Sequence, residues 1–232
     1  AWELYEDTII AELSAFFAAF YYPLVYWTLG GAEVGFLSLL TSIAVLLVLK
    51  HNRQQTYRSA LMLAVVLSMA ILTRSESILL AGVIFFFMLI QAWRMKRIFK
   101  KSTILMILLA GGICMSTVIA HSLFRYLYYG DALPNTYYLK LYGVPLDLRM
   151  ARGAKTLLAL ALYHFTPFIV LLSVWGLMHK KTIHHIESII GAVIIVQLFY
   201  HIYVGGDFME WTQFANRYLS VVIPVGFPLI AK

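Results

Sequence analysis

Long apolar runs alternate along this chain with short polar stretches. A bilayer-crossing helix needs roughly 17–25 predominantly apolar residues, and most of the runs approach that length. The shorter runs are expected to form tilted or partly buried helices. The runs cover residues 9–29, 33–49, 60–73, 78–93, 103–121, 154–178, 189–204 and 218–231. The pattern predicts an all-α fold, a polytopic membrane bundle of about eight transmembrane helices.

The polar stretches between the runs are of two kinds, and the two kinds alternate. Basic stretches, rich in Lys and Arg, cover residues 50–59, 94–102 and 179–188. Mixed stretches, which hold acids, aromatics and glycines beside the cations, cover residues 30–33, 74–77, 121–153 and 205–217. Loops with excess Lys and Arg stay in the cytoplasm. We therefore expect the basic loops and both chain ends inside, and the mixed stretches outside.

Composition agrees with a membrane protein and excludes several functions. The chain is 62% hydrophobic and 12% charged, whereas soluble domains are about 45–50% apolar and about 25% charged. The net charge of +7 does not indicate nucleic-acid binding, because most cations lie in the short loops between apolar runs. No P-loop, GxGxxG, HExxH or CxxC motif is present, so nucleotide hydrolysis is unsupported. The sequence requires no cofactor and leaves a divalent metal open.

Two features concern the extent of the chain. The first residues, AWELYEDT, are acidic and do not resemble a signal peptide. Because the first residue is not Met, we expect a piece of a longer protein. Residues 1–232 are interpreted as one transmembrane domain. Residues 121–153, rich in Tyr, are expected to form a long structured external loop that lies at the interface with short helices.

Charged residues at the edges of membrane segments are costly and indicate function by default. Four clusters of such residues occur. In the first, Glu33 follows the turn Gly30-Gly31, where it either binds substrate or caps the next helix. In the second cluster, Arg74 and Glu76 lie between two apolar runs that are joined by almost no loop. They pair or snorkel at the interface, or they present an Arg to a phosphate.

The third cluster is the most polar part of the chain. Arg125 and Lys140 bracket a segment whose turns are marked by glycine and proline. Tyr129, Asn135 and Thr136 lie within it, where an aromatic ring, an amide and a hydroxyl suit a sugar. Asn135 and Thr136 could instead cap a following helix. The alternative is an ordinary interfacial loop. We predict that the segment forms one wall of a binding site.

The fourth cluster follows the apolar run 189–204, the second to last of the chain. Gly205 and Gly206 are expected to end a helix and to permit close backbone approach. Asp207 comes next, as a general base, a metal ligand or the structural partner of an Arg, and Arg217 follows at the outer mouth. His201, just before the glycines, is interpreted as a hydrogen-bonded structural residue rather than as a metal ligand.

Taken in order, the four clusters resemble bacterial membrane glycosyltransferases of the GT-C type. The likeness is greatest to the branch that contains the mycobacterial terminal arabinofuranosyltransferase, and it spans most of the chain. Two departures are Ser75, where the family usually has Pro, and a longer separation between Asp207 and Arg217. The matching segments are Tyr26-Trp27 with Gly31-Ala32-Glu33, Leu72-Thr73-Arg74-Ser75-Glu76, Tyr128-Tyr129-Gly130 with Pro134-Asn135-Thr136 and Lys140, and Gly205-Gly206-Asp207-Phe208-Met209 with Arg217-Tyr218-Leu219.

The resemblance implies sugar transfer from a polyprenyl-phosphate donor to a cell-envelope glycan or lipid acceptor. It places the protein in the bacterial cytoplasmic membrane with its active face outside, in contact with membrane lipid and without nucleic acid. It implies that the main catalytic acid belongs to a preceding segment, with Asp207 the best candidate within the chain. The implied substrate-binding residues are Glu33, Arg74, Glu76, Arg125, Tyr129, Asn135, Thr136, Lys140 and Arg217. The alternatives are a transporter or flippase for a lipid-linked sugar, and a catalytically incomplete scaffold.

Overall fold

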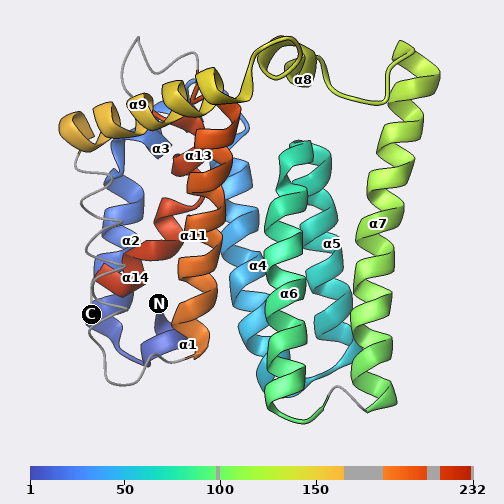
Figure 1. The fold of residues 1–232 in the computed structure, drawn as a ribbon. Coiled ribbons are helices and arrows are strands. Elements are labelled where there is room, and N and C mark those ends of the chain that lie inside the picture. The colour runs from blue at the N-terminus through green and yellow to red at the C-terminus, as the bar shows by residue number, and fades with distance from the viewer. Residues whose placement is uncertain (98–99, 165–184, 208–214, 231–232) are drawn as a thin grey trace. The chain divides into compact units, whose positions relative to one another are not determined.

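The computed structural model describes residues 1–97, 100–164, 185–207 and 215–230, and its regular structure there is entirely helical. The chain divides into two compact units, Ala1–Leu39 with Tyr138–Lys232 (unit 1), and Leu40–Tyr137 (unit 2). The helices, labelled in Figure 1, are α1 Trp2–Tyr5, α2 Thr8–Phe20, α3 Tyr22–Leu29, α4 Val34–Gln54, α5 Tyr57–Thr73, η1 Ser75–Ser77, α6 Ile78–Arg94, α7 Lys101–Tyr129, α8 Asn135–Lys140, α9 Leu146–His164, α11 His185–Val204, α13 Arg217–Ser220 and α14 Ile223–Ile230. The all-α expectation holds for the described part of the chain.

Within the described residues, four helical segments are long and apolar enough to cross a membrane. They are Val34–Gln54, Ser75–Arg94, Lys101–Tyr129 and Glu187–Val204. A fifth is reached if the bent pair α2 and α3 counts as one span. The chain is therefore a helical protein of membrane type, and the total of eight spans stays a prediction.

Three of the expected segments are short, divided or only partly described. The run 60–73 forms α5, a helix of 17 residues. The run 218–231 is divided between the short helices α13 and α14, which are separated at Val221 and Val222. The run 154–178 begins inside α9, and its residues 165–178 lie outside the described residues. Apolarity alone did not reveal the break at Val221 and Val222.

The first apolar run is also broken. Helices α2 and α3 meet at an angle of 52°. Tyr21 between them has an extended backbone, and Pro23 occupies the first turn of α3. Proline has no N–H and its ring collides with the carbonyl four residues earlier, so α2 cannot continue through this position. The hydrophobic pattern predicted one continuous segment over residues 9–29, whereas the structure has two helices that meet at a bend.

The long segment 121–153 also has different boundaries. Residues 121–129 continue α7, which ends at Gly130 in the left-handed conformation, with φ of 81°. The short helix α8 follows, and α9 begins at Leu146. Short helices were expected here, but the loop is shorter than predicted because α7 extends past the apolar run by two turns.

Unit 2 is built around α5, α6 and α7, which run alongside one another in Figure 1. Leu63 and Leu67 of α5 are fully buried. A polar seam joins α5 to α7, where the Thr117 hydroxyl donates to Ser68 Oγ at 3.1 Å. Such small side chains allow close helix approach and hydrogen bonding inside a membrane.

Unit 1 contains a close backbone crossing between α9 and α11. A Cβ built on Gly153 of α9 would lie 2.5 Å from the carbonyl oxygen of Ile202 in α11, and 2.7 Å from its Cα. Only glycine fits between the two backbones at this point. The crossing fixes α9 against the end of α11 from which the polar cluster around Asp207 begins.

Candidate functional site

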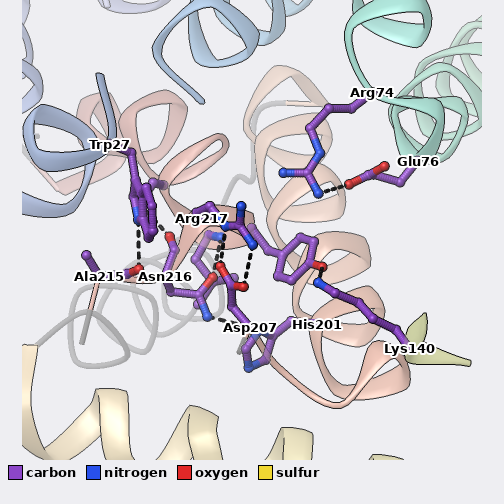
Figure 2. Close-up of polar contacts among 12 residues, drawn as sticks. Trp27, Arg74, Glu76, Lys140, His201, Asp207, Ala215, Asn216 and Arg217 are labelled. Atoms are coloured by element: carbon purple, nitrogen blue, oxygen red, sulfur yellow. Dashed lines mark hydrogen bonds and ion pairs between the residues drawn. The ribbon is translucent and has the colours of Figure 1, made fainter. Parts of the chain in front are cut away.

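Asp207 and Arg217 form the centre of a polar cluster in unit 1. Helix α11 ends at Val204, and Gly205 and Gly206 then adopt φ values of 88° and 81°, which other residues rarely adopt. This turn carries the Asp207 side chain into the protein, where it is 0% exposed. Arg217, the first residue of α13, reaches the same carboxylate. Figure 2 shows the two side chains facing each other.

The contact between them is bidentate. Arg217 donates from Nε to Asp207 Oδ2 at 2.5 Å and from Nη2 to Oδ1 at 2.7 Å. The hydrogen bond to Asp207 raises the pKa of Arg217 above its usual value. Because both carboxylate oxygens are engaged, the role shown for Asp207 is that of partner to an Arg. Its service as a general base stays a prediction.

An aromatic side chain and a second acid complete the surroundings of Arg217. The guanidinium lies 5.1 Å from the centre of the Trp27 ring. Trp27 Nε1 donates to the carbonyl of Ala215 at 2.7 Å, which ties α3 to the segment before α13. Glu33, which directly precedes α4, is close enough for its charge to raise the pKa of Arg217. Glu33 and Arg217, predicted from separate motifs, therefore lie in one neighbourhood.

Lys140 joins this cluster through Tyr218. Its Nζ donates to the Tyr218 hydroxyl oxygen at 2.6 Å and lies 5.1 Å from the centre of the same ring. Tyr218 is buried, and it directly follows Arg217. Four of the predicted residues, Glu33, Lys140, Asp207 and Arg217, are thus brought together in unit 1.

A chain of hydrogen bonds, in which each donor and acceptor can be assigned, links the cluster to α11 and α9. Asn216 caps α13, since its Oδ1 accepts from Leu219 N at 2.9 Å. Its amide nitrogen therefore faces His201 Nδ1 at 3.0 Å, which must accept. His201 Nε2 then carries the proton and donates to Thr156 Oγ1 at 3.1 Å. Thr156 in turn donates to the Gly153 carbonyl at 2.9 Å. The chain assigns a neutral His201 protonated on Nε2, and the expectation of a structural histidine is confirmed.

The His201 chain leads to a stability prediction. His201→Phe is expected to lower the free energy of unfolding by about 2 kcal/mol, because a buried amide loses its acceptor and a buried hydroxyl loses a donor. Equilibrium denaturation of the purified protein in mixed micelles measures the change. His121→Phe, on α7 of unit 2, serves as the control; it removes a single part-buried hydrogen bond from Arg125 and should cost less than about 1 kcal/mol. Equal losses in both variants would contradict the assigned chain.

The remaining predicted residues belong to unit 2. Arg74 and Glu76, flanking the first residue of η1, form an ion pair, as the pairing alternative predicted (Figure 2). Arg125 donates from Nε to His121 Nε2 at 3.1 Å, one turn back on α7. Tyr129 ends α7 with an exposed ring packed against Tyr128.

Asn135 and Thr136 form the first turn of the six-residue helix α8. The two residues therefore begin a helix that ends at Lys140, and they do not lie in an open loop. Convergence of all four clusters on one external cavity stays a prediction.

Some contributors had no role assigned from the sequence. Trp27 was named only as part of the first matching segment, and Thr156 was not singled out. Both act through contacts with residues far along the chain, which no local pattern encodes. Asn216 did carry a signal, because Asn is a favoured helix N-cap. Among the described residues, no three His, Cys, Asp or Glu side chains gather in a metal-binding group. Comparison with family models, curated proteins and solved structures found no match to this chain.

Proposed function

We propose that this chain takes part in transferring a sugar from a polyprenyl-phosphate donor to a cell-envelope glycan or lipid acceptor. The reaction takes place at the outer face of the bacterial cytoplasmic membrane. The observation that carries the proposal is the Asp207–Arg217 pair with Lys140 beside it, in an apolar helical chain. The pair lies just beyond the end of the candidate span Glu187–Val204, and in the proposed reaction a lipid-linked substrate meets the aqueous phase there.

The cations suit the departing group of such a reaction. When the sugar leaves its carrier, negative charge develops on the lipid phosphate, and fixed positive groups stabilise it. Arg217 uses two of its five N–H donors on Asp207. The bidentate contact fixes the guanidinium plane, so its other N–H groups are directed without the entropic cost of ordering a free side chain. Lys140 adds a second positive charge, oriented by Tyr218.

Asp207 and the acceptor base then have separate roles. A carboxylate with both oxygens bound to a guanidinium is a poor proton acceptor. In the proposed reaction Asp207 holds Arg217 in place, and a different carboxylate deprotonates the acceptor hydroxyl. The Arg217 guanidinium lies over the Trp27 ring, whose face attracts the cation and helps to hold it in place.

The proposal is tested by sugar transfer with the purified protein in nanodiscs. A panel of short-chain prenyl-phosphate sugars serves as donor and extracted envelope glycan as acceptor. Arg217→Lys keeps the charge but loses the bidentate fork, and Lys140→Gln removes a cation. Each should lower the transfer rate by about a hundredfold or more. Arg152→Gln, an exposed cation on α9, is the control and should retain activity. Undiminished transfer by both variants would reject the assignment.

A second candidate is transport of a lipid-linked sugar, which the bend between α2 and α3 favours. Transporters often contain discontinuous helices around their substrate site, and this pair bends by 52°. Reconstitution into liposomes distinguishes the two functions. Movement of a lipid-linked sugar between leaflets without any transfer product would replace the first proposal. A scaffold role, in contrast, predicts that Arg217 variants leave the envelope glycan unchanged.

A further inference from the structure

Arg149 presents buried guanidinium donors at the crossing of α9 and α11. Its side chain is half-buried, and its Nε and Nη1 atoms are shielded from solvent without a hydrogen-bond partner among the described residues. The guanidinium carbon lies 5.0 Å from the centre of the Tyr203 ring on α11. A stacked aromatic face attracts the cation but does not satisfy its N–H groups. Arg149 therefore retains unused hydrogen-bonding capacity in a shielded place.

The backbone around Arg149 is tightly fixed. A Cβ built on Gly205 would lie 3.2 Å from the Arg149 carbonyl oxygen and 3.5 Å from its Cα. Gly205 also has φ of 88°, so a side chain there would be strained in addition. This contact holds the first turn of α9 against the end of α11, close in sequence to Asp207. The Arg149 side chain thus projects from a rigid position rather than from a free loop.

The nearby acids among the described residues do not account for this cation. Each carboxylate oxygen of Asp207 accepts a hydrogen bond from the Arg217 guanidinium. Asp147 is exposed and lies two positions away on the same helix, where side chains do not face each other. The segment 138–164 has four cations, Lys140, Arg149, Arg152 and Lys155, against the single acid Asp147. The local charge therefore favours an anion.

We propose that Arg149 binds an oxyanion of the phosphate class at a site of its own, where α9 crosses α11. A buried charge without a partner is strongly unfavourable, and a buried unsatisfied donor requires an explanation. A phosphate-class oxyanion supplies both the charge and the acceptor atoms that a guanidinium recognises. The proposal concerns binding alone, so it stands independently of sugar transfer.

The test uses the purified protein in phosphatidylcholine nanodiscs and measures the midpoint of thermal unfolding. One arm adds inorganic phosphate, with sodium chloride at matched ionic strength as the reference. The other arm places phosphatidic acid in the nanodisc, which offers the same phosphomonoester on a lipid. A ligand that binds only the folded state raises the midpoint. We expect a rise in at least one arm for the wild-type protein. The arm that responds identifies a free or a lipid-borne phosphate.

Three variants decide whether Arg149 is responsible. Arg149→Gln should remove the rise, and Arg149→Lys should weaken apparent phosphate binding by about tenfold, equivalent to ~1.4 kcal/mol. Arg152→Gln, three residues along the same helix, loses the same charge and should keep the rise. If Arg149→Gln does not fold, the comparison of Arg149→Lys with the wild type decides.

Other results would overturn the proposal. No rise in either arm would mean that the guanidinium is satisfied by water or by the chain itself. An equal loss in Arg152→Gln would mean that the effect is general surface charge. Sugar transfer is not measured in these experiments, so a failure here leaves the proposed reaction untouched, and the reverse also holds.

Discussion

Replacing Arg217 by Leu is expected to lower the free energy of unfolding by about 3–5 kcal/mol. The physical reason is the state of its partner. Asp207 is 0% exposed and places both oxygens on the Arg217 guanidinium. Without the guanidinium, the carboxylate stays buried with its charge uncompensated, which is far more unfavourable than losing an exposed ion pair. Denaturation in mixed micelles, followed by circular dichroism, measures the loss.

The double variant Asp207→Asn with Arg217→Gln separates the buried charge from the shape of the site. With both charges removed, an amide faces an amide, and we expect at least half of the lost stability to return. Arg58→Leu is the matched control, because Arg58 is an exposed cation at the start of α5, and it should cost less than about 0.5 kcal/mol. If the single and double variants were equally unstable, the loss would come from packing rather than charge.

The second large effect is expected at Gly153. Gly153→Ala should lower the free energy of unfolding by about 3 kcal/mol, near the upper end of overpacking effects. The added methyl group would meet three backbone atoms of Ile202 within 2.9 Å. Backbone atoms cannot rotate away as a side chain can, so α9 and α11 must separate. The separation would also stretch the hydrogen bonds through which Thr156 and His201 join these helices.

Gly111→Ala provides the contrast to this variant. Gly111 also lies inside a helix, and a Cβ there would meet nothing within 4 Å. Because alanine favours helix over glycine, the control should be neutral or gain up to about 1 kcal/mol. Both variants are measured by the same denaturation. A stable Gly153→Ala protein that retained the wild-type tryptophan fluorescence would show that the two helices do not cross so closely.

Local chemistry in the sequence predicted individual turns and pairs well. The glycines before Asp207, the position of Glu33 just before a helix and the Arg74–Glu76 pair all follow from neighbouring residues. Steric freedom of glycine and short-range charge attraction act over a few positions, so a single sequence shows them. A hydrogen-bonded structural role was also predicted for His201, although its partners were not.

Long-range contacts could not be predicted in the same way. Trp27 and Ala215 are separated by 188 positions, and their hydrogen bond depends on how α3 meets α13. The break of the last apolar run at Val221 falls among apolar residues, so the hydrophobic pattern did not reveal it. The extension of α7 to Tyr129 passes His121 and Arg125, polar residues at which the same pattern ended the segment. Arg149 looked like one more cation of the mixed stretch 121–153, and only its contacts with Tyr203 and Gly205 distinguish it from Arg152.

The bend at Tyr21 has a consequence for water. Where α2 ends and α3 begins, the regular helical hydrogen-bond ladder is interrupted, and Leu24 N and Val25 N both donate to the Tyr21 carbonyl at the bend. Hydrocarbon cannot satisfy unpaired backbone groups, and Pro23 supplies no donor of its own. Phe227 packs against the Tyr21 ring at 5.7 Å and walls off one side of the bend. If α2 and α3 cross the bilayer together, the interrupted backbone at Tyr21 must either be enclosed by protein or line a water-filled cavity. Where it lines such a cavity, water enters below the membrane surface, and a lipid-linked molecule has less distance to travel to meet it.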